Sequence, residues 1–232
     1  LQGTYKKGRR SVDDYIAQTA LANPHSEIFY TDPKGETFHH PRLTEELPRE
    51  PIPIKPHPYG VELGILIKMM KETRGRNLRG ALQSDFSRVS GKVAEAIAAA
   101  AGVPAGARPH QLTHDQVERV FKAIPTIRIM SPPTNCLSPI GEDLVRDGLS
   151  KMVPGCDFYT AVTRSPAVYR GNPFQIEAGL AYGGQIPADE QTDLWRFANR
   201  VPLQYQQSGC AITRSVILND WKKYGLTQPK GT

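Results

Sequence analysis

Two helical patterns meet at the stretch Ser87-Arg88-Val89-Ser90-Gly91-Lys92, which leaves room only for a tight connection between them. The apolar spacing predicts one helix over residues 77–86 and a second over residues 90–101, which Gly102 closes. Small and polar residues in the connection leave backbone N–H groups at the start of the second helix free to bind a phosphate. Five basic residues lie around it: Arg74, Arg76, Arg79, Arg88 and Lys92. We therefore expect a DNA-binding surface at residues 74–92.

Two further helices accompany this pair in the middle of the chain. Residues 61–70 are apolar nearly all round, as in a buried core helix, and Thr113 with Gln116 makes a capping box at the start of another helix. The pattern from Val89 to Val103 resembles the helix–two-turns–helix module of DNA-repair glycosylases and of a small-subunit ribosomal protein. We expect residues 57–134 to form an all-α domain of this kind.

A proline-rich stretch, residues 41–60, separates this helical region from the segment before it. Proline at this density favours extended polyproline geometry, so the stretch predicts a stiff spacer and the clearest domain boundary. Before it, Ser11 caps a predicted helix that Asn23-Pro24 ends, and residues 27–31 and 36–40 predict a hairpin. A helix and a hairpin are too small to bury a core of their own, so we expect this segment to belong to a larger domain.

The last third of the chain mixes helix and strand patterns. Ser138-Pro139 is the predicted cap and first residue of a helix that runs to about Met152. Alternating apolar residues after it predict strands, and the small residues 210–213 predict a buried helix. We expect an α/β domain here, with Cys210 packed in apolar surroundings.

Charge and motif content narrow the classes of function. The net charge of +6 and the pI near 9.2 fit a nucleic-acid partner. The excess lies in residues 57–134, which hold 11 Lys and Arg against 6 Asp and Glu. No apolar run approaches the ~20 residues of a membrane span. There is no CxxC pair, phosphate loop or nucleophile elbow, and Pro109 places His110 outside the helix of His114, so we expect no catalytic, cofactor or metal site.

Two basic clusters lie near the two ends of the chain. Lys6-Lys7-Gly8-Arg9-Arg10 precedes a helix cap, where a loop can wrap close to a phosphodiester. Trp221-Lys222-Lys223-Tyr224 alternates aromatic and basic side chains that can pack on sugars and meet phosphates. The alternatives are a solvated basic loop for the first, and for the second a Trp and a Tyr that cover a core. The residues expected to contact DNA are Lys7, Arg9, Arg10, Trp221, Lys222 and Tyr224.

Eight longer segments match one family in the right order along the chain. They are Lys7–Val12, Ala22–His25, Lys55–Glu62, Phe86–Ser90, Cys136–Glu142, Val168–Phe174, Arg196–Pro202 and Trp221–Leu226. On these segments the chain resembles the B subunit of DNA topoisomerase VI, the type IIB enzyme of the GHKL ATPase family, over essentially its whole length. In that family the basic loop and the aromatic–lysine motif are associated with sensing bent or crossed DNA, and the resemblance implies the same for both clusters.

The resemblance implies an α+β multidomain fold. Residues 1–55 would be the C-terminal end of a GHKL ATPase domain, an α/β sandwich, together with the proline-rich linker. Residues 57–134 would be the helix–two-turns–helix domain, and residues 135–232 the N-terminal part of an α/β transducer domain. The transducer relays the nucleotide state of the ATPase domain to the subunit that cuts DNA.

The resemblance also implies a function, that of the DNA-binding and signal-relaying part of an ATP-hydrolysing topoisomerase that passes one duplex through another, in relaxation and decatenation. The implied partners are double-stranded DNA, the A subunit and a second B subunit in an A2B2 heterotetramer, in the cytoplasm at the nucleoid and without a membrane. ATP and Mg²⁺ belong to the complete enzyme, and we expect neither on this chain, because the motifs that hold them should precede Leu1. The alternative is a non-catalytic nucleic-acid-binding or scaffold relative that reuses the same domains.

Overall fold

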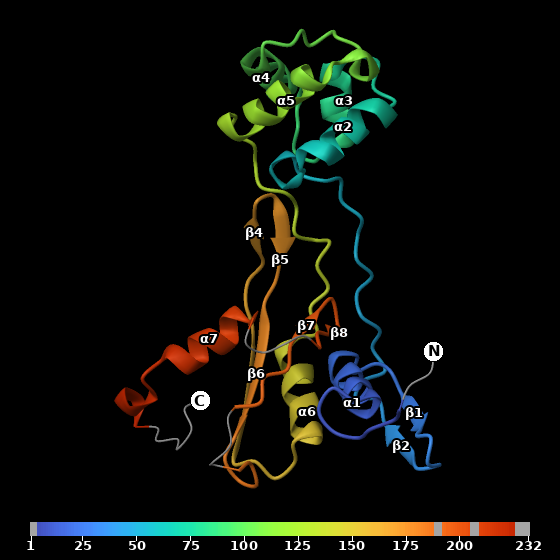
Figure 1. Cartoon of the computed structure of the whole chain (residues 1–232), viewed down its shortest axis with the longest axis vertical. Helices are drawn as coiled ribbons and strands as arrows, with labels where there is room; N and C mark the ends of the chain where they lie inside the picture. The colour runs from blue at the N-terminus through green and yellow to red at the C-terminus, as the bar shows by residue number, and fades with distance from the viewer. Residues whose placement is uncertain (1–3, 188–191, 205–208, 226–232) are drawn as a thin grey trace. The chain divides into compact units, whose positions relative to one another are not determined.

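The computed structural model describes residues 4–187, 192–204 and 209–225, which fall into two compact units (Figure 1). The helical unit comprises Glu50–Ser138 and Arg164–Ile176. The mixed unit comprises the chain up to Arg49, the segment Pro139–Thr163 and the chain from Glu177 onward. The chain is thus a mixture of helices and small sheets, while the division at residues 55 and 134 stays a prediction about family boundaries.

Four α-helices build the helical unit: α2 (Leu63–Glu72), α3 (Leu78–Asp85), α4 (Gly91–Ala101) and α5 (His114–Ala123). Three short 3-10 helices accompany them: η1 (Pro58–Gly60) precedes α2, η2 (Pro109–Gln111) lies between α4 and α5, and η3 (Ile124–Thr126) follows α5. Their apolar faces meet in one core, in which the larger side chains are fully buried: Leu66, Met70, Leu78, Leu82, Ile97 and Val120. Burial of this apolar surface is the main term that holds the unit together.

The capping box at Thr113 and the end of α4 at Gly102 are where the sequence predicts them, while Asn77, predicted as the first residue of its helix, is the cap of α3. Asn77 accepts a hydrogen bond from the Gly80 N–H at 2.8 Å, and Thr113 forms the reciprocal capping box with Gln116. Gly102 ends α4 with a left-handed φ of 62°. The prediction for residues 61–70 was partly wrong, because α2 begins at Leu63 and Ile65 is 52% exposed. That helix buries one stripe and not its whole circumference.

A hairpin also belongs to the helical unit, although it comes from the last third of the chain. Its strands are β4 (Ala167–Tyr169) and β5 (Asn172–Phe174), which pair antiparallel with Tyr169 opposite Asn172. The two residues between the strands, Arg170 and Gly171, both have positive φ, as the tight turn of a two-residue hairpin requires. The tip of the hairpin lies against residues 57–60 of the same unit.

The mixed unit begins with α1 (Val12–Ala22) and the hairpin β1 (Ile28–Thr31) and β2 (Thr37–His40). The next part is α6 (Glu142–Met152), followed by the long antiparallel strands β3 (Phe158–Thr163) and β6 (Glu177–Tyr182). The unit ends with β7 (Phe197–Ala198), β8 (Val201–Pro202), α7 (Ala211–Leu218) and the 3-10 helix η5 (Trp221–Tyr224).

Helix α6 packs between α1 and the long strand pair, and glycines allow the close approach on both sides. A Cβ on Gly148 would lie 2.7 Å from Leu21 Cδ1 of α1, and a Cβ on Gly179 would lie 3.0 Å from Val145 Cγ1. No side chain larger than hydrogen fits these two contacts without movement of a neighbour. The first segment of the chain and the strand pair therefore share one packed layer through α6.

Two predictions for the last third of the chain were wrong. Helix α6 begins at Glu142 and not at Pro139, because Gly141 has a φ of 94° and the Glu177 carboxylate accepts the N–H groups of Ile140 and Gly141 at 2.8 and 2.7 Å. Helix α7 is not a buried helix, because most of its described side chains are exposed, including Leu218 at 82%. Within the described ranges, no helix has both the length and the apolar character needed to cross a membrane.

Candidate nucleic-acid interface

The connection between α3 and α4 presents Arg88 on a fixed turn. Phe86 and Val89 are buried on either side of it, and the Ser87 N–H donates to the Pro56 carbonyl at 3.0 Å. Arg88 itself is exposed and has a left-handed φ of 60°, which is uncommon for a residue with a Cβ. The two apolar anchors thus hold the turn against the core and leave the guanidinium in solvent.

The start of α4 lies directly beyond this turn. The Ser90 hydroxyl accepts the Val93 N–H at 3.4 Å, which leaves the N–H groups of Gly91 and Lys92 without a hydrogen-bond partner in the described part of the chain. Unpaired N–H groups and the positive helix end favour an anion at this position. The Lys92 side chain is exposed beside them.

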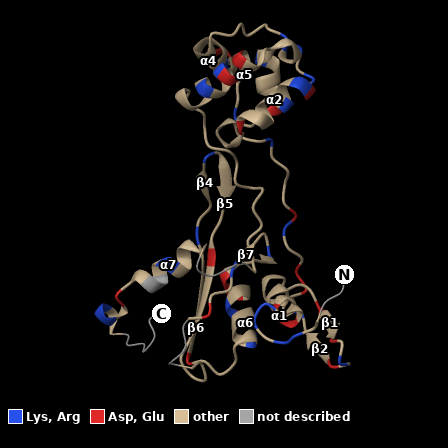
Figure 2. Ribbon diagram, viewed as in Figure 1, with Lys and Arg blue, Asp and Glu red and all other residues tan. Residues whose placement is uncertain are grey.

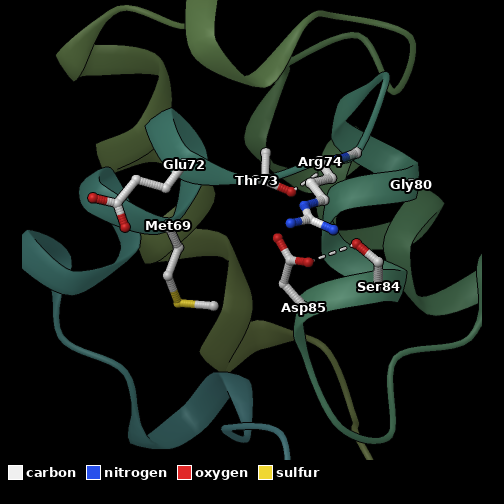
Figure 3. Close-up of a pocket in the computed structure, with 8 residues that line it drawn as sticks. Met69, Glu72, Thr73, Arg74, Gly80, Ser84 and Asp85 are labelled. Carbon is white, nitrogen blue, oxygen red and sulfur yellow. Dashed lines mark hydrogen bonds between the residues drawn. The ribbon is translucent and has the colours of Figure 1, made fainter.

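The five basic residues of this surface are not equivalent. Arg79 forms an ion pair with Glu95 at 3.2 Å and lies over Gly91, where a Cβ would meet its Nη2 at 2.8 Å. Arg74 lines a hollow of about 520 Å³ between α2 and α3, and Figure 3 shows its guanidinium turned toward the Asp85 carboxylate. Within the described ranges the other three are exposed and have no ion-pair partner: Arg76, Arg88 and Lys92. A phosphate can reach these three without displacing an acidic group, whereas Arg74, which is also exposed, has the Asp85 carboxylate beside it.

The basic side chains of the loop before α1 also differ in whether they have acidic partners. Lys7 Nζ lies 3.2 Å from the buried Asp32 carboxylate, contacts Glu36 and sits 5.1 Å from the centre of the Phe38 ring. The hydrogen bond to Glu36 raises the pKa of Lys7, although partial desolvation opposes the shift. Lys7 therefore holds the hairpin β1–β2 against the loop, and its charge is already neutralised.

Arg9 and Arg10 face outward from the same loop. Arg9 Nη2 is 3.8 Å from the Asp193 carboxylate, a loose contact between two exposed side chains that contributes little. Arg10 has a φ of 64°, and its N–H donates to Asp14 at 2.8 Å, which fixes the backbone while the side chain stays exposed. Both arginines line a hollow of about 260 Å³ in the mixed unit.

The aromatic–lysine motif forms the 3-10 helix η5. Tyr224 is 74% exposed, so it does not cover a core, whereas Trp221 is half-buried. Their ring centres are 6.1 Å apart and tilted by 52°. Lys222 is exposed, and Lys223 is loosely paired with Asp220 at 3.9 Å. The motif therefore offers one exposed ring and one exposed ammonium on a single turn.

Cys210 is buried, as the sequence predicts, but polar groups of Arg196 and Thr213 contact its sulfur, and the prediction of apolar surroundings did not include them. Arg196 Nε donates to its sulfur at 3.0 Å, while Arg196 Nη2 donates to the Thr213 hydroxyl at 2.8 Å. The Thr213 N–H lowers the pKa of the thiol most and the guanidinium adds to this, so the pKa falls to about 6 even though burial opposes it. Nothing in the local sequence signals this pairing, because Arg196 is 14 residues away.

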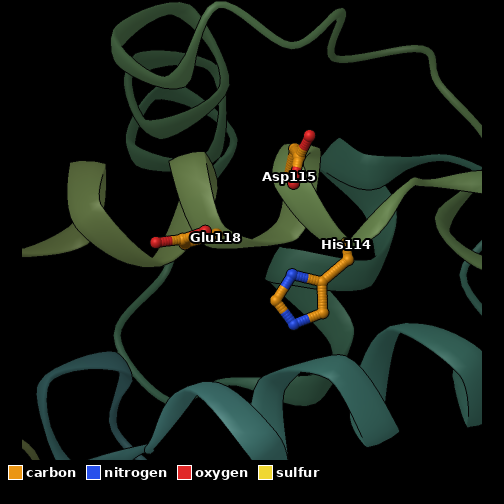
Figure 4. Close-up of side chains that lie close together, drawn as sticks. All are labelled: His114, Asp115 and Glu118. Carbon is orange, nitrogen blue, oxygen red and sulfur yellow. The ribbon is translucent and has the colours of Figure 1, made fainter.

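Three possible metal ligands meet at the start of α5, where the sequence predicts no metal site. The ligand atoms of His114, Asp115 and Glu118 lie within 4.8 Å of one another (Figure 4). The group is largely exposed, and Glu118 forms an ion pair with Lys122 at 2.7 Å. Because Lys122 already occupies one carboxylate, the cluster is a solvated helix start, and its spacing of one and four residues along a helix is common.

Comparison of the sequence with known proteins shows the family of the chain. Residues 132–232 match the family model described as topoisomerase VI B subunit, transducer. Over 232 residues, 100% of its length, the chain is 45% identical to the B subunit of type 2 DNA topoisomerase 6 from Methanococcoides burtonii. It is 42% identical to the protein of the same name from Archaeoglobus fulgidus and 36% identical to that from Saccharolobus islandicus, over 99% and 97% of the chain. The chain belongs to the family of topoisomerase VI B subunits.

The match covers only part of these B subunits. The chain spans 37% of the Methanococcoides protein, 38% of the Archaeoglobus protein and 43% of the Saccharolobus protein. The transducer match begins at residue 132, so it contains α6, the long strand pair and also the hairpin β4–β5. A segment of a topoisomerase VI transducer therefore packs within the same compact unit as the four helices α2–α5.

Proposed function

We propose that this chain is the DNA-contacting and signal-relaying part of the B subunit of an ATP-dependent type IIB DNA topoisomerase. The observation that carries the proposal is the connection between α3 and α4, where Arg88 and Lys92 flank unpaired N–H groups at a helix start. Helix ends and arginines of this kind contact phosphates and not base edges, so binding is tolerant of sequence. Tolerance of sequence is what an enzyme that acts on DNA crossings needs.

The relay follows from how the first segment of the chain is joined to the rest of the mixed unit. Arg200 donates to the carbonyls of Ala22 at 3.5 Å and Pro139 at 3.0 Å, and its own carbonyl accepts from the Asn23 amide at 3.1 Å. The end of α1, the approach to α6 and the turn between β7 and β8 thus meet at one side chain. A displacement of α1 would reach the transducer strands through Arg200 and the α1–α6 contact.

The remaining parts of the proposal come with the family. The complete enzyme would bind ATP and Mg²⁺, and its partners would be double-stranded DNA, an A subunit that cuts DNA and a second B subunit in an A2B2 assembly. Strand passage would then relax and decatenate DNA. Among the described residues the one cluster of metal ligands, at His114, is solvated and partly occupied by Lys122, so it does not fit a nucleotide-bound Mg²⁺.

The test is the salt dependence of DNA binding by the complete B subunit. Each lost phosphate contact flattens the plot of log K against log salt by about 0.9, so Arg88→Ala with Lys92→Ala should flatten it by about 1.8. The matched control is Lys68→Ala with Lys71→Ala, which removes the same charge from exposed positions of α2, a helix that packs on α5 and η2. Fluorescence anisotropy with a short linear duplex gives both slopes. If the slope changes equally in the two double variants, DNA is attracted by the general charge of the protein and the proposal is wrong.

A further inference from the structure

The hairpin β4–β5 ends in an arginine that is held in a defined place. Arg170 and Gly171 form its turn with φ values of 47° and 75°. A left-handed backbone is uncommon for an arginine, and it persists where the surroundings enforce it. Figure 2 shows this turn in blue, the colour of Lys and Arg, at the end of the two strands. Arg170 is exposed, and its guanidinium carbon lies 5.3 Å from the centre of the exposed Tyr169 ring.

Two glycines fix the tip of the hairpin against the turn His57–Gly60. A Cβ on Gly171 would lie 2.7 Å from His57 Nδ1, and a Cβ on Gly60 would lie 2.9 Å from the Arg170 carbonyl oxygen. His57 is buried, and its Nε2 donates to the Met130 carbonyl at 2.9 Å. The contact is therefore backbone on backbone, with a buried imidazole behind it, so the position of Arg170 is set by packing.

Arg88 approaches the same turn from the connection between α3 and α4. The neighbouring Ser87 N–H donates to the carbonyl of Pro56, the residue before His57, at 3.0 Å. The positive charge of Arg88 acts on His57, where it adds to the effect of burial in lowering the imidazole pKa. Arg88 and Arg170 thus border the turn His57–Gly60, one on each of two segments that lie far apart in the sequence.

A third arginine, Arg128, lies in the segment after α5 whose backbone binds the Tyr59 side chain. The Tyr59 hydroxyl accepts the Ile129 N–H at 3.0 Å and donates to the Ile127 carbonyl. Ile127 and Ile129 are turned inward, and the residue between them, Arg128, is exposed. In the described part of the chain none of the three arginines has an acidic partner: Arg88, Arg128 and Arg170.

Because none of these three guanidinium groups has an acidic partner among the described residues, each can bind an anion without displacing a carboxylate. Arginine is the preferred side chain for a phosphodiester, because its planar fork donates two hydrogen bonds at once. The backbone positions are already fixed, so little ordering opposes binding. We propose that Arg170 and Arg128 bind phosphates of the duplex that Arg88 contacts, so that the transducer hairpin extends the DNA surface of the helical unit. This inference rests on the function proposed above.

The experiment compares Arg170→Ala and Arg128→Ala with Arg164→Ala in the complete B subunit. Arg164 is exposed and is six residues from Arg170 on the same hairpin, about 20 Å along an extended strand. That distance exceeds the screening length of about 8 Å at physiological salt, so the control removes the same charge outside the site. With a short linear duplex, we expect each test variant to flatten the salt slope by about 0.9, so that its affinity falls about 3.5-fold less between 50 and 200 mM salt than that of the unchanged protein. The control slope should not change.

The outcomes separate this inference from the proposed function. If Arg88→Ala flattens the slope while Arg170→Ala and Arg128→Ala behave like the control, the inference is wrong and the DNA surface is confined to α3 and α4. If Arg88→Ala, Arg170→Ala and Arg128→Ala all leave the slope unchanged, both the inference and the proposed function are wrong. If Arg170→Ala weakens binding of the A subunit in a pull-down but leaves the DNA slope intact, the arginines serve an acidic protein surface and the inference is again wrong. A thermal melt of each variant excludes loss of folding as the cause.

Discussion

Three of the four basic side chains of the loop before α1, those of Lys7, Arg9 and Arg10, should separate into one structural residue and two DNA contacts. The perturbations are Lys7→Ala alone and the double change Arg9→Ala with Arg10→Ala. Lys7 is bound between Asp32 and Glu36, so its removal deletes no free charge from the surface. Arg9 and Arg10 are exposed, and the contact of Arg9 to Asp193 is loose at 3.8 Å. Only the double variant should weaken the attraction to DNA.

The magnitude follows from counting the free cations of the loop. Two lost phosphate contacts flatten the salt slope by about 1.8, so the affinity of the variant should fall about 12-fold less between 50 and 200 mM salt than that of the unchanged protein. Lys7→Ala should leave the slope unchanged and lower the melting temperature instead, because the buried Asp32 carboxylate loses its cation. Two backbone N–H groups still bind Asp32, so the fold should persist.

The assay measures binding of the complete B subunit to a supercoiled plasmid and to a short linear duplex, with thermal melts alongside. A bent or crossed duplex presents more phosphate to a small loop than a straight one, so the Arg9 and Arg10 double variant should lose more affinity for the plasmid. Equal losses on both substrates would leave only general charge attraction. A slope change for Lys7→Ala as large as that for one arginine would refute the assignment of Lys7 to the fold.

Two further predictions concern the helical unit. Gly75→Ala places a Cβ 2.5 Å from the Ala81 backbone nitrogen, so we expect a loss of about 1–3 kcal/mol in the free energy of unfolding by denaturant, and a loss below that range would mean the backbone adapts freely. Burial and the charge of Arg88 lower the pKa of His57, although its hydrogen bond to Met130 opposes this. As the pH falls, the imidazole of the unfolded chain therefore takes up a proton before that of the folded chain. The free energy of unfolding should thus decrease as the pH drops below about 6.5. Melting curves from pH 7.5 to 5 should show the fall, and His57→Gln should reduce it; an identical profile for the variant would assign the effect elsewhere.

Local signals in the sequence account for most of the helices and the first hairpin. The caps at Ser11, Asn77 and Ser90 depend on side chains within three residues of the N–H groups that they accept, so a reading of neighbours is sufficient. The turn over residues 32–35 is equally local, because the Asp32 carboxylate accepts the N–H groups of Lys34 and Glu36. These elements form where they were predicted.

Contacts between distant segments explain what the sequence did not reveal. The start of α6 moved to Glu142 because Glu177, 36 residues beyond Gly141, binds the N–H groups before it. A contact between distant segments also removes one basic residue from the candidate site, because Arg79 forms an ion pair with Glu95. A count of basic residues in the sequence cannot show which cations already have a partner in the fold.

Four of the five described non-glycine residues with a left-handed backbone are arginines: Arg10, Arg88, Arg170 and Arg200. Each left-handed position costs about 1–2 kcal/mol relative to glycine, which would adopt it without strain. Selection for thermal stability alone would therefore favour glycine at the exposed positions Arg10, Arg88 and Arg170. A stabilised version of this domain obtained by screening for heat resistance would tend to lose its positive charge at these three turns, and a gain in melting temperature would then accompany a loss of attraction to polyanions.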